Sequence, residues 1–144
     1  MLGNLVLGTL VISLTVLVYT LGLTLLSRAM AMLVGGLRLD AHGVGRHVAM
    51  VATVLFLFLI LTVEVWLWAA IYSVSGIIGS FEEALYFSTV TFSTVGYGDV
   101  TPPYDWRLFC SLEGVNGFLL IGWSTAYLVS ASIRHGPFRT GEHF

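Results

Sequence analysis

The chain has 144 residues, of which 57% are hydrophobic and only 10% are charged, with a formal net charge of −2. This composition, with a mean hydropathy of +0.92, excludes an ordinary soluble domain, and the chain is too short to hold a catalytic domain beside its apolar runs. It has no basic patch for nucleic acid, and its single cysteine, Cys110, excludes an internal disulfide and a multi-cysteine metal site. We therefore expect one membrane domain that is not an enzyme and has no soluble substrate.

Three apolar runs are long enough to cross a bilayer, which needs about 20 helical residues. They lie at approximately 2–26, 48–72 and 108–133. The first run has no basic segment before it and is longer than a signal-peptide core, which favours a retained helix over a cleaved signal. The predicted fold class is an all-α membrane protein with three transmembrane helices. Its predicted segments are a first helix within 1–27, a loop at 28–47, a second helical part at 48–133 and a tail at 134–144.

The arginines predict the orientation of these helices. Five of the six lie either near the 28–47 loop or in the tail, and only Arg107 lies between the second and third runs. By the positive-inside rule, the loop and the tail are cytoplasmic and the N-terminus is outside. Trp66, Trp68 and Tyr72 end the second run, where we expect them to anchor the helix at the outer interface. Residues 30–39 either extend the first helix or lie along the inner membrane surface.

Between the second and third runs, the sequence predicts a short helix that re-enters the membrane. Ser80-Phe-Glu-Glu83 matches a capping box, in which Ser80 caps the Glu83 amide and Glu83 reaches back. The apolar stretch that follows, 84–92, is too short to span a bilayer. A helix over 81–92 places the negative end of its dipole at Ser93 and Thr94, which favours a cation there.

Residues 93–99 read Ser-Thr-Val-Gly-Tyr-Gly-Asp. Gly96 and Gly98 adopt left-handed backbone angles at little steric cost, so successive carbonyl groups can point toward one axis. A ring of such carbonyls replaces the water shell of a dehydrated potassium ion. Since one chain offers one strand, a closed ring requires an oligomer. The alternatives are a phosphate-binding loop, which lacks the expected preceding strand and lysine, and a turn without any transport role.

With these residues, the stretch of roughly 48–133 resembles the pore domain of tetrameric potassium channels, as a small prokaryotic-type member with an extra N-terminal helix. The resemblance implies an outer helix (48–72), a pore helix (81–92), a filter (94–98) and an inner helix (108–133), assembled as a homotetramer in the cell membrane among lipid. It implies potassium as the transported ion and no cofactor. It further implies that Thr94, Val95, Gly96, Tyr97 and Gly98 coordinate K+, that Tyr86, Phe87 and Asp99 support the filter, that Gly117 is a hinge, and that Phe118, Ile121, Thr125 and Val129 line the pore.

The chain departs from this family pattern at two places. Some bacterial members pair a pore-helix glutamate with the aspartate after the filter, but this chain has Val90 at that position. The helix predicted at 2–26 lies outside the two-helix pattern. It lacks the repeated arginines of a voltage sensor, which argues against voltage gating through it.

Glu113 is an ionisable residue inside an apolar run, and such residues are candidates for function. Three interpretations are open. Glu113 lies behind the filter, bonded to hydroxyls such as those of Thr89 or Thr91; it gives the cavity a negative field; or it is a protonated or capped side chain in a helix contact. For the whole chain, the alternatives to a potassium channel are a poorly selective cation channel and a non-conducting regulatory subunit.

Overall fold

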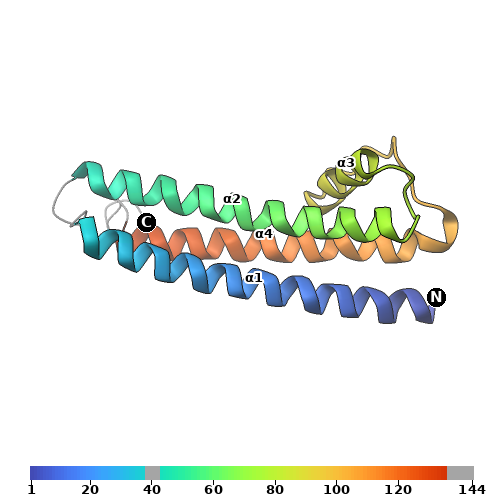
Figure 1. The fold of residues 1–144 in the computed structure, drawn as a ribbon, viewed down its shortest axis with the longest axis horizontal. Coiled ribbons are helices and arrows are strands. Elements are labelled where there is room, and N and C mark those ends of the chain that lie inside the picture. Colours follow the sequence, from blue (N-terminus) through green and yellow to red (C-terminus); the bar gives the residue numbers. More distant parts are fainter. Residues whose placement is uncertain (38–42, 136–144) are drawn as a thin grey trace. The chain divides into compact units, whose positions relative to one another are not determined.

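The computed structural model describes residues 1–37 and 43–135, and the ribbon is shown in Figure 1. Within these ranges the secondary structure is helical, as predicted for an all-α protein, and the predicted filter strand at 94–98 is not a β-strand on the single chain, which offers it no partner strand. The chain divides into two compact units, one of residues 1–19 with 61–121 and the other of residues 20–60 with 122–144. The elements are α1 (Leu2–Leu37), α2 (Gly43–Val74), α3 (Phe81–Phe92), the 3-10 helix η2 (Tyr104–Trp106) and α4 (Arg107–His135).

The helix bounds correct one sequence-based prediction. The loop predicted at 28–47 is helical on both sides, because α1 continues to Leu37 and α2 begins at Gly43. Residues 28–34 contain neither glycine nor proline, and Ala, Met and Leu are strong helix formers, so nothing local ends the helix at Arg28. The alternative in which this segment extends the first helix is therefore confirmed as far as Leu37. The middle of the predicted loop and most of the tail lie outside the described residues.

Two helices meet the length and apolarity expected of a membrane span, over residues 2–32 of α1 and 45–74 of α2. The helix α4 occupies the third predicted run, but it is less apolar than the other two, with Glu113, Asn116 and three glycines in its sequence. A third membrane crossing at α4 therefore stays a prediction.

The first unit is built around a cluster of aromatic rings, Trp68 and Tyr72 from α2, Phe87 from α3 and Phe109 from α4. The ring centroids of Trp68 and Phe109 are 5.5 Å apart, and those of Tyr72 and Phe87 are 5.4 Å apart. Figure 1 shows α3 beside the C-terminal part of α2, and the Ser88 hydroxyl of α3 contacts the Val65 carbonyl oxygen of α2. Edge-to-face aromatic pairs and the apolar area that they bury position α3 on α2 and α4.

This cluster overturns part of the interface prediction. Trp68 and Tyr72 have no exposed surface, whereas Trp66 is 54% exposed and packs edge-on against Phe81. Trp66 alone of these three stays available to anchor the helix at an interface. A sequence pattern cannot separate an aromatic residue at the membrane surface from one that faces a neighbouring helix, because both lie near a helix end.

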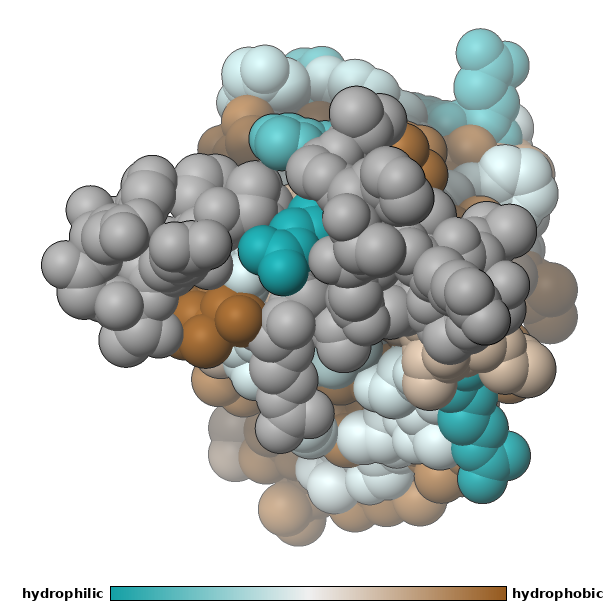
Figure 2. Space-filling view, turned by 90° about the vertical axis from the view of Figure 1, so that its left-hand side faces the viewer, coloured by the Kyte–Doolittle hydropathy of each residue, from teal (hydrophilic) through white to brown (hydrophobic). Residues whose placement is uncertain are grey.

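The second unit has a narrow apolar core and an apolar outside. Leu26, Ala49 and Leu57 are buried, and the Ser27 and Tyr127 hydroxyl oxygens lie 3.1 Å apart. Figure 2 shows apolar side chains open at the surface of the molecule. Such a large exposed apolar surface is expected of a protein covered by lipid or by other chains. In this unit it includes Leu21, Leu25, Met32, Val51, Leu55 and Phe58.

Candidate functional site

The helix α3 begins with a side-chain cap. The Glu83 amide donates to Ser80 Oγ at 3.1 Å, and the Ser80 backbone is extended, with φ −117° and ψ 154°. This is the first half of the predicted capping box; in this described segment no bond returns from the Glu83 side chain. Glu82 and Glu83 lie in the first turn, where the helix dipole stabilises negative charge. The local sequence therefore determines where α3 starts.

The segment after α3 has alternating backbone angles. Gly96 and Gly98 have φ of 55° and 77°, as the sequence predicts, and Thr94 also has a positive φ, of 61°. Left-handed angles cost a non-glycine residue roughly 1–2 kcal/mol, and no sequence signal marked Thr94 for this conformation. The segment adopts neither helix nor strand at residues 95–97. Alternation of left-handed and other residues turns successive peptide groups toward the same side.

A hydrogen bond fixes the direction of one of these peptide groups. The Gly96 amide donates to the Val90 carbonyl oxygen of α3 at 2.9 Å. The peptide that joins Val95 to Gly96 is trans, as are the other described peptide bonds, so its carbonyl is antiparallel to its N–H. The Val95 carbonyl oxygen therefore points away from α3, toward the exposed side of the segment.

The C-terminal end of the segment is held by Tyr86 and Asp99. The Tyr86 hydroxyl donates to Asp99 Oδ2 at 2.6 Å, and the Val100 amide donates to Asp99 Oδ1 at 3.1 Å. The bond from Tyr86 is the main cause that lowers the pKa of Asp99 below its ordinary value. Tyr86 thus contacts the aspartate directly, whereas the apolar side chain of Val90 offers it no hydrogen-bonding group. Phe87, the second predicted support, is buried against Tyr72.

Glu113 is completely buried behind α3 and joins three helices. The Tyr72 hydroxyl of α2 donates to Glu113 Oε2 at 2.6 Å, and the Ser88 hydroxyl oxygen of α3 lies 2.5 Å from Glu113 Oε1. These contacts fit two of the open interpretations, Glu113 bonded to hydroxyl groups of the short helix and Glu113 as a protonated or capped side chain in a helix contact, and the hydroxyl partner is Ser88 rather than Thr89 or Thr91. Thr89 bonds instead to the Leu85 carbonyl of its own helix. Sequence spacing missed Ser88 because the rotation of α3 is set by its packing.

Gly117 lies where α4 contacts the end of α3. A Cβ at this position would overlap the Phe92 carbonyl oxygen and would lie 2.8 Å from the carbonyl carbon and 2.9 Å from Cα of Phe92. The helix α4 is continuous through Gly117. The structure therefore gives this glycine a packing role, while the hinge implied by the family resemblance stays a prediction.

The N-terminal half of α1 is bonded to α4 and to the segment before it. Asn116 Nδ2 donates to the Thr15 hydroxyl at 2.9 Å, and both residues are buried. Asn4 Nδ2 donates to the Asp105 carbonyl oxygen. In the sequence, Thr15 is one of many hydroxyl residues in α1, so nothing marked it as the partner of Asn116.

The predicted pore-lining residues are mostly exposed on the single chain. Phe118 is 66% exposed and Val129 is 45% exposed, Thr125 is also exposed, and Ile121 is half-buried. In the segment after α3, Val95 is 53% exposed and Tyr97 is 72% exposed. One chain does not enclose any of these surfaces.

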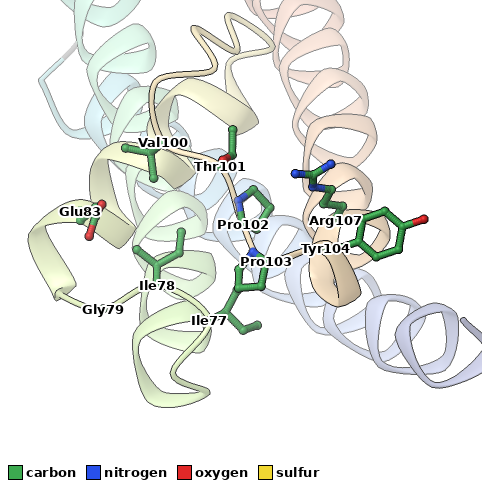
Figure 3. Close-up of a pocket in the computed structure, with 10 residues that line it drawn as sticks. All are labelled: Ile77, Ile78, Gly79, Glu83, Val100, Thr101, Pro102, Pro103, Tyr104 and Arg107. Carbon is green, nitrogen blue, oxygen red and sulfur yellow. The ribbon is translucent and has the colours of Figure 1, made fainter.

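Two further features lie near this site. Glu64 and Trp68 are fully buried in α2, one turn apart, and the Glu64 oxygens and Trp68 Nε1 have no hydrogen-bond partner. A pocket of about 400 Å³ lies between the turn after α2 and the segment after Asp99 (Figure 3). Glu83 and Arg107 lie on opposite sides of this pocket.

Comparison with known proteins identifies the family. Residues 53–134, more than half of the chain, match the family described as "Ion channel". The chain belongs to this ion channel family. The matched range contains most of α2, all of α3 and nearly all of α4, so it includes every contact of the site except those made by α1. As a member of the family with two apolar helices, this ion channel is a multi-pass membrane protein, a transporter rather than an enzyme. No curated protein and no solved structure matches the chain.

Proposed function

We propose that four copies of this chain form a potassium-selective channel, with residues 94–98 as its filter. The observation that carries the proposal is the anchored peptide between Val95 and Gly96. Its N–H is used by α3, so its carbonyl oxygen is free to face an axis shared with other copies. Oxygen rings of this kind replace the hydration shell of K+. In the assembly, Thr94, Val95, Gly96, Tyr97 and Gly98 supply these oxygens.

The proposed assembly accounts for the exposed filter. Non-helical backbone at membrane depth is stable only where protein or water surrounds it. Val95 and Tyr97 are more than half exposed on one chain, so other copies must supply the missing surroundings. The same assembly encloses Phe118, Ile121, Thr125 and Val129 as the lining of the inner pore.

The proposed orientation places the N-terminus and Asp99 outside and the C-terminal end of α4 in the cytoplasm, with α4 as the third membrane crossing. Asp99 then lies at the outer mouth. Its ionised form, favoured by the bond from Tyr86, attracts cations to the entrance. The helix α3 points the negative end of its dipole at the inner end of the filter.

Ion flux from liposomes tests this function. The purified chain is reconstituted, and efflux is driven by a gradient of K+ or, in a parallel sample, of Na+. We expect flux with K+ and little with Na+. Native mass spectrometry of the same protein should give four times 15.7 kDa.

The matched variants are Gly96→Ala and Gly79→Ala. A Cβ meets nothing within 4 Å at either position, but only Gly96 has a positive φ. Alanine at 96 therefore strains the filter backbone by roughly 1–2 kcal/mol, whereas alanine at 79 does not. We expect G96A to lose K+ flux or selectivity and G79A to behave as the wild type.

Other outcomes separate the alternatives. Equal flux of K+ and Na+ indicates a poorly selective cation channel, and a tetramer without flux indicates a non-conducting regulatory subunit. Selective K+ flux that G96A leaves unchanged would contradict the filter assignment.

A further inference from the structure

We propose that Glu113 is a neutral carboxylic acid that donates its own proton to Ser88, and that the resulting chain of hydrogen bonds positions α3 against α2 and α4. The direction of this chain is from Tyr72 to Glu113, from Glu113 to Ser88, and from Ser88 to the Val65 carbonyl. The proton assignment does not depend on the proposed function, while its consequence for the filter rests on that function.

The first argument is a count of protons. The Ser88 hydroxyl has one proton, yet its oxygen lies 2.5 Å from Glu113 Oε1 and 2.9 Å from the Val65 carbonyl oxygen. A carboxylate and a carbonyl only accept hydrogen bonds. If Glu113 were ionised, one of these oxygen pairs would lie at hydrogen-bond distance without its own proton. One shared proton would make two bent bonds, and bent bonds are weak.

A neutral Glu113 satisfies every group in the cluster. Its Oε1–H donates to Ser88, Ser88 then donates to the Val65 carbonyl, and Oε2 accepts the proton of Tyr72. Each hydroxyl group then donates one hydrogen bond, and one proton lies between the two oxygen atoms of each close pair.

The second argument concerns charge. Glu113 has no exposed surface and lies in an apolar helix. No arginine whose side chain the structure describes bonds to it, and Arg107 lies instead over the Tyr104 ring, with 5.6 Å between Cζ and the ring centroid. A buried carboxylate without a counter-charge is costly, and such a group becomes neutral instead.

The chain of bonds connects the elements that hold the filter. Ser88 lies in the middle of α3, and the Val90 carbonyl two residues later accepts the Gly96 amide. A rotation of α3 that broke the Ser88 contacts would also move this anchor. Glu113 is therefore a positioning residue, which acts on the filter through α3.

Infrared spectroscopy of the protein in liposomes tests the protonation. A protonated carboxyl group has a carbonyl stretch that shifts in D2O, and Glu113→Gln should remove one such band. Glu64→Gln is the companion variant, because Glu64 is the other carboxyl group buried in a described helix and also lacks a partner, so E64Q should remove a different band from E113Q. If the E113Q spectrum keeps every protonated-carboxyl band of the wild type, the proposal is overturned, whatever the variant does to flux.

Flux gives the second readout. The glutamine amide has the shape of the neutral acid, donates to Ser88 and accepts from Tyr72, so we expect E113Q to assemble and conduct K+ as the wild type does. Glu113→Ala removes the acceptor of the Tyr72 hydroxyl and the donor to Ser88, and we expect a loss of selective flux of about tenfold or more. An E113Q protein that fails to assemble, or that loses flux as E113A does, would contradict the neutral acid. Absence of K+ flux in the wild type would contradict the proposed function and leave the infrared result standing.

Discussion

The backbone of Gly117 in α4 packs directly on the Phe92 carbonyl group at the end of α3, with no space for a side chain between them. This contact joins the helix that we propose to line the pore to the residue that ends the helix behind the filter. Gly114, one turn earlier, faces the Thr91 carbonyl oxygen, which would lie 3.5 Å from a Cβ at this position. Close approach of α4 to α3 therefore depends on small residues at this crossing.

Gly117→Ala should destabilise the protein. Overpacking of a close contact costs about 1–3 kcal/mol, which exceeds the 0.5–1 kcal/mol or so by which alanine otherwise favours a helix over glycine. Gly122→Ala is the control, because a Cβ there meets nothing within 4 Å. In thermal unfolding in detergent we expect a lower midpoint for G117A and an unchanged or higher one for G122A. A raised midpoint in G117A would favour a flexible hinge over a packing contact.

Thr15→Val should weaken the attachment of α1 to α4. The valine has nearly the same shape but leaves Asn116 Nδ2 buried without an acceptor, which costs about 1–3 kcal/mol. Thr9→Val is the matched control, since the exposed Thr9 hydroxyl bonds only to the Leu5 carbonyl of its own helix. The measurement is the midpoint of thermal unfolding. Equal midpoints for T15V and T9V would show that the bond to Asn116 contributes nothing.

Tyr86→Phe should raise the pKa of Asp99. The Tyr86 hydroxyl favours the ionised carboxylate, so the folded-state pKa lies below the ordinary value of 3.8. Its contribution to stability is present above that ordinary value and is lost as the pH falls through the lowered one. Titration of the carboxyl carbon of Asp99 by NMR checks this. Tyr104→Phe is the control, because Tyr104 lies beside Arg107 and not beside Asp99; an equal titration in Y86F and wild type would contradict the assignment.

Ser80→Ala should destabilise the start of α3. It removes the acceptor of the Glu83 amide, and loss of such a cap costs about 1 kcal/mol. Ser80→Asp keeps an acceptor at the cap and should restore the stability. Hydrogen exchange at the Glu83 amide measures the effect locally, with faster exchange expected in S80A only. Equal protection in all three proteins would mean that the cap is not formed.

Much of this architecture is readable from local sequence. The capping serine and the short apolar stretch define α3 to the residue, since both signals act within a few positions of the chain. The glycine alternation likewise predicts the positive φ of Gly96 and Gly98, because the absence of a Cβ is a property of the residue itself. Apolar length predicts three membrane spans, and the first two of these are the candidates found in the structure, because hydropathy is a property of the local sequence.

The tertiary structure alone decided which side chains meet. The rotation of α3 decides that Glu113 contacts Ser88 and not Thr89. The position of Phe109 decides that Trp68 and Tyr72 face inward. The partner of Asn116 is 101 residues away in sequence. Hydrophobicity and backbone preference are read along the chain, but hydrogen-bond partners are set by how helices rotate and cross, which the packing of all of them determines together.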